Sequence, residues 1–470
     1  MKIAYIHYHL KTGGVTTVLR HQIKAVKNSC EPLVITGSPP ESPFPADFVH
    51  IPGLGYYDGL SGKVFEPENV AEAITAAIFS RWKDGCDILH VHNPTLAKNI
   101  NFLKILKELQ KRKIKLFLQI HDFAEDGRPS AYFHEEYLSD CHYGVINSRD
   151  YNILLKTGLK KEGLHKIFNT IKPFDLKQKN PGSKEYVLYP IRAIRRKNIG
   201  EAILLSRFFS NNADLVITQP PNSPADIISY KGWKKYVKEK NLNVEFEAGL
   251  KRDFKELVYS AKFLITTSIT EGFGFSFLEP WTADKILYGR KLDDICCDFE
   301  QKGIKLDHLY TKLLVPVKWI GKENLYEKLK SSILKAGSLF NYSLTRKNID
   351  RFYLAVTKNS NIDFGLLDEA FQKQVLSRIL SSKKDMDSLI MLNPYISHLG
   401  DLPNKDELIQ KNRRAVLDNY NEKIYKQTLL KIYSRVIKKP VCQSIDKNIL
   451  LSEFLNPDNF SLLKWADYVE

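Results

Sequence analysis

The chain has 470 residues, 43% of them hydrophobic, which is enough for two or three domains with a substantial core. The formal net charge is +16, yet no zinc-finger, helix-turn-helix or RNP-type motif accompanies it, so the sequence argues against a nucleic-acid partner. No apolar stretch approaches the roughly 18 residues of a membrane span, and the six cysteines include no CxxC pair, so we expect a globular protein of a reducing cytoplasm without disulfides or a metal site.

Residues 1–172 alternate short β-branched or aromatic runs with longer amphipathic stretches, which is typical of βαβ units and a parallel sheet. The predicted strands are residues 2–9, 32–38, 87–93, 115–122, 143–148 and 165–171. The predicted helices are residues 14–28, 67–81, 97–112 and 149–157. Residues 172–184, rich in proline, glycine, lysine and asparagine, predict a linker after this first Rossmann-like domain.

The alternation restarts after the linker and predicts a second Rossmann-like domain over residues 185–335. Its predicted strands are residues 185–192, 214–218, 244–250 and 262–270, and its predicted helices are residues 198–209 and 253–260. Residues 336–410 are expected to form a helical insertion and 411–470 C-terminal helices, with one long helix over 412–436. The predicted fold class is therefore α/β, with two doubly wound domains facing across a cleft and extra C-terminal helices.

Two loops that follow predicted strands offer groups for a phosphate. Gly13 and Gly14 precede a helix, where exposed N–H groups favour an anion, although a plain tight turn is an equal alternative. In the second domain, Arg192 ends a strand and Lys197 precedes a helix, with two more arginines between them. Cations at the carboxyl edge of a sheet would neutralise a diphosphate, whereas the alternative is a solvated charge run.

The stretch TTSITEGFGFSFLEPW places Glu271 at the end of a predicted strand and Glu279 in the first turns of the next helix. Between them, Gly272, Phe273 and Gly274 are expected to expose backbone N–H donors at a helix start. A carboxylate accepts hydrogen bonds from pairs of hydroxyl groups, so two of them around an anion site suit a sugar on one side and a ribose on the other. The pattern thus predicts a nucleotide-sugar site.

In order and spacing, these motifs resemble those of the retaining GT-B glycosyltransferases of family 4. The matching features are the Gly-Gly loop, HVHNP at 90–94, QIHD at 119–122, Arg-x4-Lys and Glu-x7-Glu. The resemblance implies that Arg192 and Lys197 hold the donor diphosphate close to the amides of Gly14. It implies further that Glu271 holds the donor hexose, that Glu279 binds the ribose, and that His121 lies beside the donor sugar.

The resemblance also implies a metal-independent transfer of a hexose, with retention, from a UDP- or GDP-linked sugar to a hydroxyl group. The leaving phosphate would help to deprotonate the acceptor, so neither His90 nor Asp122 is needed as a base. A small-molecule or oligosaccharide acceptor is favoured over a lipid or a polysaccharide. A disaccharide phosphorylase of the same fold and a catalytically silent binding protein are the remaining alternatives, and the oligomeric state stays open.

Three further segments carry expectations of their own. Arg290 follows a strand-like run, and a surface position is favoured over entry into the cleft. Arg128 lies in a long charged loop and would either meet an anionic acceptor or stay exposed. The basic amphipathic helix at 104–115 would present either a solvated face or a contact with a membrane surface.

Overall fold

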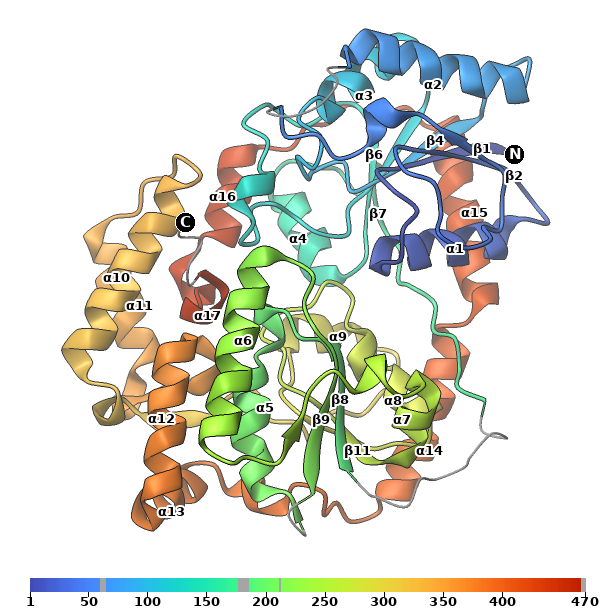
Figure 1. The fold of residues 1–470 in the computed structure, drawn as a ribbon. Helices are drawn as coiled ribbons and strands as arrows, with labels where there is room; N and C mark the ends of the chain where they lie inside the picture. Colours follow the sequence, from blue (N-terminus) through green and yellow to red (C-terminus); the bar gives the residue numbers. More distant parts are fainter. Residues whose placement is uncertain (60–64, 176–185, 211–212, 466–470) are drawn as a thin grey trace. The chain divides into compact units, whose positions relative to one another are not determined.

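Two parallel β-sheets, one in each of two units, organise the part of the chain that the structure describes (Figure 1). The structure is a computed structural model, and it describes residues 1–59, 65–175, 186–210 and 213–465. Unit 1 comprises Met1–Thr170 and Tyr420–Phe454, and unit 2 comprises Ile171–Asn419 with the residues from Leu455 onward. Most of the predicted linker, residues 176–184, lies outside the described residues.

The described sheet of unit 1 has seven strands in the order β3-β2-β1-β4-β5-β6-β7, each parallel to its neighbours. Its strands are β1 (Lys2–His7), β2 (Glu31–Thr36), β3 (Phe48–His50), β4 (Ile88–His92), β5 (Leu116–Gln119), β6 (His142–Val145) and β7 (Leu164–Lys166). Its helices include α1 (Gly14–Val26), α2 (Pro67–Arg81), α3 (Phe102–Lys111) and α4 (Ser148–Lys156). The strand order reverses between β1 and β4, and in a doubly wound sheet ligands bind at the carboxyl ends of the strands at this reversal.

The core of unit 1 lies on both faces of its sheet. Successive residues of β1 alternate between two apolar clusters, so that Ala4 and Ile6 pack on one side and Ile3 and Tyr5 on the other. Burial on both faces explains why the strands read as continuous apolar runs. The predicted basic amphipathic helix is α3, and its apolar residues are buried within the first of these clusters, beside α2.

Unit 2 has a described five-stranded parallel sheet in the order β10-β9-β8-β11-β12. Its strands are β8 (Tyr186–Arg192), β9 (Asp214–Gln219), β10 (Val244–Glu245), β11 (Ala261–Thr266) and β12 (Leu287–Gly289), and a separate antiparallel pair joins β13 (Leu314–Pro316) to β14 (Asn361–Asp363). The helices beside the sheet include α5 (Ile199–Leu205), α6 (Pro224–Glu239), α7 (Phe254–Ser260), α8 (Glu279–Thr282) and α9 (Asp293–Glu300).

Two predicted strands of unit 2 are shorter than the sequence suggested. The strand predicted over 244–250 ends at Glu245, because Glu247 adopts φ 66° and a 3₁₀ turn, η7 (Ala248–Leu250), follows it. The strand predicted over 262–270 ends at Thr266. The remaining residues of that run form a loop at the carboxyl edge of the sheet, which is where a ligand-binding segment belongs.

The long helix predicted over 412–436 is wrong as a single element. The chain forms α14 (Lys405–Asn419) and α15 (Glu422–Lys438), because Asn421 caps α15 by accepting a hydrogen bond from the backbone N–H of Ile424. The two helices belong to different units. Figure 1 shows α15 beside α1, where its apolar side chains join the core that contains Tyr5.

The other C-terminal helices complete the two units. Unit 2 also contains α10 (Lys322–Ser338), α11 (Arg346–Val356), α12 (Glu369–Ser381), α13 (Lys383–Leu392) and α17 (Leu462–Trp465), and unit 1 contains α16 (Lys447–Phe454). Within the described residues, no helix combines the length and the apolar character that crossing a membrane requires.

Candidate active site

The candidate donor site of unit 2 is built on two loops at the carboxyl edge of its sheet, after β8 and after β11. The first contains the 3₁₀ turn η4 (Arg195–Lys197). The Tyr189 hydroxyl donates to the Lys197 carbonyl oxygen at 2.6 Å, and the Thr267 hydroxyl donates to the same oxygen at 3.1 Å. The backbone N–H of Ile269 donates to the carbonyl oxygen of Arg196 at 3.0 Å. These bonds hold the two loops together, so the side chains they carry are positioned by the sheet.

Lys197 and Glu271 form a nearly buried ion pair across these two loops, in which the lysine Nζ donates to Oε1 of the carboxylate. Their side chains are only 14% and 9% exposed. Burial alone would raise the pKa of Glu271, but the positive charges of Lys197 and Arg196 outweigh it and hold the pKa below its ordinary value. Glu271 is therefore an ionised acceptor, suited to hydrogen bonds from hydroxyl groups.

Glu279 begins α8 and is half-buried. Burial raises its pKa to about 7, although the positive charge of Lys197 opposes the shift. The two predicted glutamates thus share the influence of one lysine but differ in protonation near neutral pH. Glu279 accepts hydroxyl hydrogen bonds fully only after it has lost its proton.

The segment between the two glutamates turns at Gly274, where φ is 90°. A Cβ atom added there would also lie 3.0 Å from the ring of Phe277, so glycine is required by conformation and by space. The ring of Phe273 is buried and packs edge-on against Phe275 and Phe299. Phe273 therefore anchors the turn in the core of unit 2, and Gly272 beside it is half-buried.

The arginines of the loop after β8 separate in space. Arg192 is exposed, and its Nη1 donates to the carbonyl oxygen of Pro220 at 3.0 Å. Arg195 turns toward α12, where its Nε donates to Glu369 at 2.9 Å. Arg196 contributes positive charge at Glu271. The structure therefore brings Lys197, Arg196 and Glu271 together, whereas Arg192 stands at the end of β8 with its guanidinium on the next loop.

The favoured surface position of Arg290 is wrong. Arg290 is 4% exposed and pairs with Glu201 at 2.6 Å and with Asp363 at 2.7 Å. A buried guanidinium needs such partners, and two carboxylates supply them. Glu201 also accepts from the side chain of Asn198, the left-handed residue that directly follows Lys197. Arg290 thus braces the loop that carries the donor-site lysine, a role that the sequence did not reveal.

In unit 1, Gly14 and His121 lie at the carboxyl edge of the sheet. A Cβ atom added to Gly14 would meet no atom within 4 Å, so its backbone at the start of α1 is open to an incoming group. His121 follows β5, and its Nε2 is 2.9 Å from Nδ1 of His92. Its backbone N–H donates at 2.8 Å to the side chain of Asn93, which has φ 53°. His121 is thus fixed by the last residue of β4 and by the first residue of the loop that follows it.

The buried histidines of unit 1 are neutral. Burial lowers the pKa of His121 to about 4 and that of His90 to about 3. His90 lies within β4, where its two ring nitrogens contact the Tyr433 hydroxyl at 3.0 Å and the Gln119 side chain at 2.9 Å. The contact with Tyr433 ties β4 to α15, so His90 has a structural role.

Arg128 is neither fully exposed nor isolated. Its guanidinium pairs with Asp122 at 2.9 Å, and the side chains are 30% and 25% exposed. The positive charge of Arg128 also contributes to a lowered pKa at Lys98, a residue that the sequence did not single out. A lone lysine in the loop after HVHNP carries no local signal, because only the fold brings it near the loop after β5.

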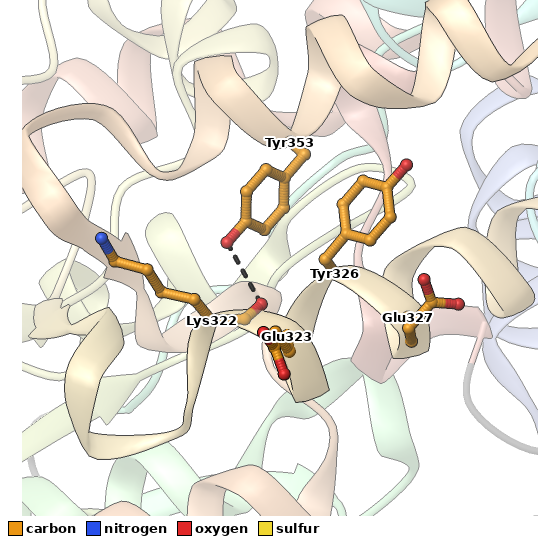
Figure 2. Close-up of a pocket in the computed structure, with 5 residues that line it drawn as sticks. All are labelled: Lys322, Glu323, Tyr326, Glu327 and Tyr353. Atoms are coloured by element: carbon orange, nitrogen blue, oxygen red, sulfur yellow. Dashed lines mark hydrogen bonds between the residues drawn. The ribbon is translucent and has the colours of Figure 1, made fainter.

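A surface pocket of about 380 Å³ lies away from these residues, between α10 and α11. Figure 2 shows its lining, in which the Tyr353 hydroxyl donates to the carbonyl oxygen of Lys322 at 3.2 Å. Tyr326, Glu323 and Glu327 complete the lining. The pocket contains none of the sequence-predicted site residues. Among the described residues, no group of three or more histidine, cysteine, aspartate or glutamate side chains is arranged to hold a metal ion.

Comparison with known proteins finds one curated relative and several solved structures that resemble the chain. No family model matches the chain. A curated relative, mannosylglucosyl-3-phosphoglycerate synthase from Petrotoga mobilis, is 28% identical, and the match covers 97% of this chain and 98% of the relative. Among solved structures, Anabaena Alr3699/HepE in complex with UDP and glucose has a TM-score of 0.53 at 10% identity, covering 92% of this chain and 99% of that one. A glycosyltransferase from Rickettsia africae has a TM-score of 0.52 at 12% identity, covering 93% and 99%.

The chain has the GT-B fold. The predicted α/β class, with two Rossmann-like sheets and extra C-terminal helices, is therefore confirmed. Membership of family 4, retention, metal independence and the roles of the individual residues stay predictions. The structure adds one point to them: Glu271 lies on the loop that follows β11 at the carboxyl edge of the sheet, and Glu279 is the first residue of α8.

Proposed function

We propose that the chain is a glycosyltransferase that moves a mannosyl residue from a nucleotide-diphosphate sugar to a hydroxyl group of glucosyl-3-phosphoglycerate. The acceptor class rests on the relative named mannosylglucosyl-3-phosphoglycerate synthase, whose likeness extends over nearly the full length of both chains. A small acidic glucoside of this kind agrees with the small-molecule acceptor that the sequence favours.

The observation that carries the transferase proposal is the Lys197–Glu271 pair with Arg196 beside it. Lysine and arginine groups held at a sheet edge stabilise the negative charge that develops on a diphosphate leaving group. The ionised Glu271 accepts hydrogen bonds from hydroxyl groups of the donor hexose. Glu279 accepts hydrogen bonds from the ribose, and Arg192, Gly14 and His121 remain predicted donor contacts.

The proposed reaction breaks the bond between the anomeric carbon and the diphosphate oxygen and forms a bond from the same carbon to an acceptor oxygen. The acceptor proton passes to the leaving diphosphate, on the face that the new oxygen approaches, so the configuration at the anomeric carbon is retained. Electrostatic stabilisation of the diphosphate and alignment of the two substrates supply the rate enhancement. No metal ion is required in this scheme.

The test offers glucosyl-3-phosphoglycerate with UDP-, GDP- and ADP-linked mannose or glucose to the full chain in the presence of EDTA. The product is identified by mass spectrometry and its anomeric configuration by NMR. One donor should give a retained product, and Lys197→Met should abolish transfer. Lys240→Met is the matched control, because this exposed lysine follows α6 on the opposite edge of the sheet.

Two outcomes contradict the proposal. If Lys197→Met transferred the sugar as fast as the wild type, Lys197 would not be part of the donor site. Phosphate-dependent cleavage of a disaccharide, without transfer from any nucleotide sugar, would show that the phosphorylase alternative is correct.

A further inference from the structure

Three loops of unit 1 bring a tyrosine and two cations together at the carboxyl edge of its sheet. Tyr56 follows β3, Lys98 follows β4, and Arg128 follows β5. The Lys98 ammonium lies 5.8 Å from the centre of the Tyr56 ring. Backbone bonds fix the arrangement, since the N–H of Tyr57 donates to the carbonyl oxygen of Lys98 at 2.8 Å, and the N–H of Ala97 donates to Ala131 at 2.7 Å.

The positive charge of Arg128 acts on the pKa of both Lys98 and Tyr56. Burial is the largest cause of a lowered pKa at Lys98, the positive charge of Arg128 lowers it further, and Asp122 only partly opposes them. Burial raises the pKa of Tyr56, and Arg128 acts against that rise. The lysine thus keeps its charge at a net electrostatic cost in the free protein, and an anion bound beside it would remove that cost.

The cluster is open to a ligand. Tyr56 is 61% exposed, and its hydroxyl lies 3.1 Å from Nε2 of His9, which follows β1. Asp122 accepts a hydrogen bond from Nη2 of Arg128 at 2.9 Å. A guanidinium carries five N–H donors in a planar fork, a geometry suited to contact with more than one acceptor.

We propose that Lys98 and Arg128 bind the acid groups of the acceptor and thereby select a phosphorylated, carboxylated glycoside over a neutral sugar. The proposal rests on the proposed function and assigns the acceptor's recognition to two named side chains. The planar guanidinium suits a carboxylate or phosphate in two-point contact, whereas the ammonium acts as a point charge. Phosphoglycerate carries both kinds of acid group, so each cation has a partner.

The first experiment titrates 3-phosphoglycerate into the full chain by calorimetry. Lys98→Met keeps the apolar stem beside Tyr56 and removes the charge, and Arg128→Lys keeps the charge and removes the planar fork. Each loss of a charge-assisted contact should weaken binding about ten- to a hundredfold. Lys83→Met is the matched control, because this exposed lysine precedes β4 on the opposite edge of the same sheet. Melting temperatures equal to that of the wild type show that the variants fold.

A second experiment separates this inference from the proposed function. Transfer to glucosyl-3-phosphoglycerate is compared with transfer to glucosylglycerol, which lacks both acid groups, at saturating donor. The variants should raise the KM for the acidic acceptor and leave both the KM for the neutral one and the affinity for the nucleotide unchanged.

The results of the two experiments distinguish failure of the anion site from failure of the proposed function. If 3-phosphoglycerate binds through Lys98 and Arg128 but no sugar is transferred, the proposed function fails and the anion site stands. If the acidic acceptor is used but neither substitution changes its KM, the anion site fails and the proposed function stands. Absence of 3-phosphoglycerate binding to the wild-type chain would also overturn the anion site.

Discussion

Replacing Glu279 with glutamine is expected to stabilise the free protein above pH 7 and to weaken nucleotide binding at the same time. Glu279 is half-buried at the start of α8, and burial raises its pKa from 4.5 to about 7. The proposed role of this carboxylate is to accept hydrogen bonds from the ribose. A glutamine of nearly the same shape cannot ionise, so it avoids the burial of a charge and loses the stronger acceptor.

The sign of the stability effect follows from proton binding. Between pH 4.5 and 7 the folded chain keeps a proton on Glu279 that the unfolded chain releases, so the free energy of unfolding falls as the pH rises. The contribution of protonated Glu279 is fully present below pH 4.5 and is lost once the pH has passed 7. At 1.36 kcal/mol for each pKa unit, the loss is about 3 kcal/mol. Glu279→Gln should therefore match the wild type near pH 4.5 and exceed it by up to about 3 kcal/mol at pH 8.

The assay combines urea denaturation with nucleotide titration at several pH values. If only ionised Glu279 accepts the ribose, the affinity of the wild type for its donor nucleotide should rise about tenfold between pH 6 and pH 8. Glu279→Gln should bind more weakly and lose this dependence. Glu323→Gln, at the surface pocket of Figure 2, is the control and should change neither quantity. A stability difference that is the same at every pH, or unchanged nucleotide affinity in Glu279→Gln, would refute the reasoning.

Three further predictions concern the supporting structure. Arg290→Met leaves two buried carboxylates without their cation and should lower the free energy of unfolding by about 3–5 kcal/mol. Urea denaturation measures this change, and a loss of less than about 1 kcal/mol would contradict the buried network. Gly289→Ala should destabilise the chain by more than about 1 kcal/mol, because φ is 120° there and the new Cβ would lie 1.9 Å from the Thr266 carbonyl oxygen; a melting temperature equal to the wild type's would argue against this close approach. The imidazole of His121, identified in NMR spectra by its loss in His121→Asn, should titrate near pH 4, and titration near pH 6.5 would show that it is not buried.

The strands and helices of both sheets could be predicted because their signals are local. Burial on both faces produces continuous apolar runs, and the intervening helices show a longer period. The helix boundary that the sequence missed also has a local cause, but its signal in the sequence is weak. A single asparagine, Asn421, ends the apparent continuity of residues 412–436, and the repeating apolar pattern on both sides of it hides the cap.

Candidate site residues could be predicted from the sequence where each belongs to a short local motif. Lys197 and Glu271 were predicted on that basis, and the fold brings them into contact although they lie 74 residues apart. Arg290 was misplaced because its partners are Glu201 and Asp363, which lie 89 and 73 residues away and carry no motif of their own. A charged residue after a strand-like run is normally solvated, and only the fold supplies the carboxylates that make burial favourable.

Glu271 and Glu279 show why the spacing of two carboxylates in the sequence does not predict their protonation states. Burial acts on both in the same direction, toward a higher pKa, and the sequence treats them as equivalent carboxylates. Lys197 contacts Glu271 directly but acts on Glu279 only through its charge, so the first stays ionised while the second holds its proton until about pH 7. A donor diphosphate that drew the ammonium of Lys197 to itself would weaken this pairing and leave Glu271 free to accept the hydroxyl groups of the hexose. The ion pair of the free protein would thus hold the carboxylate charged, and the arriving substrate would supply the hydrogen bonds that replace it.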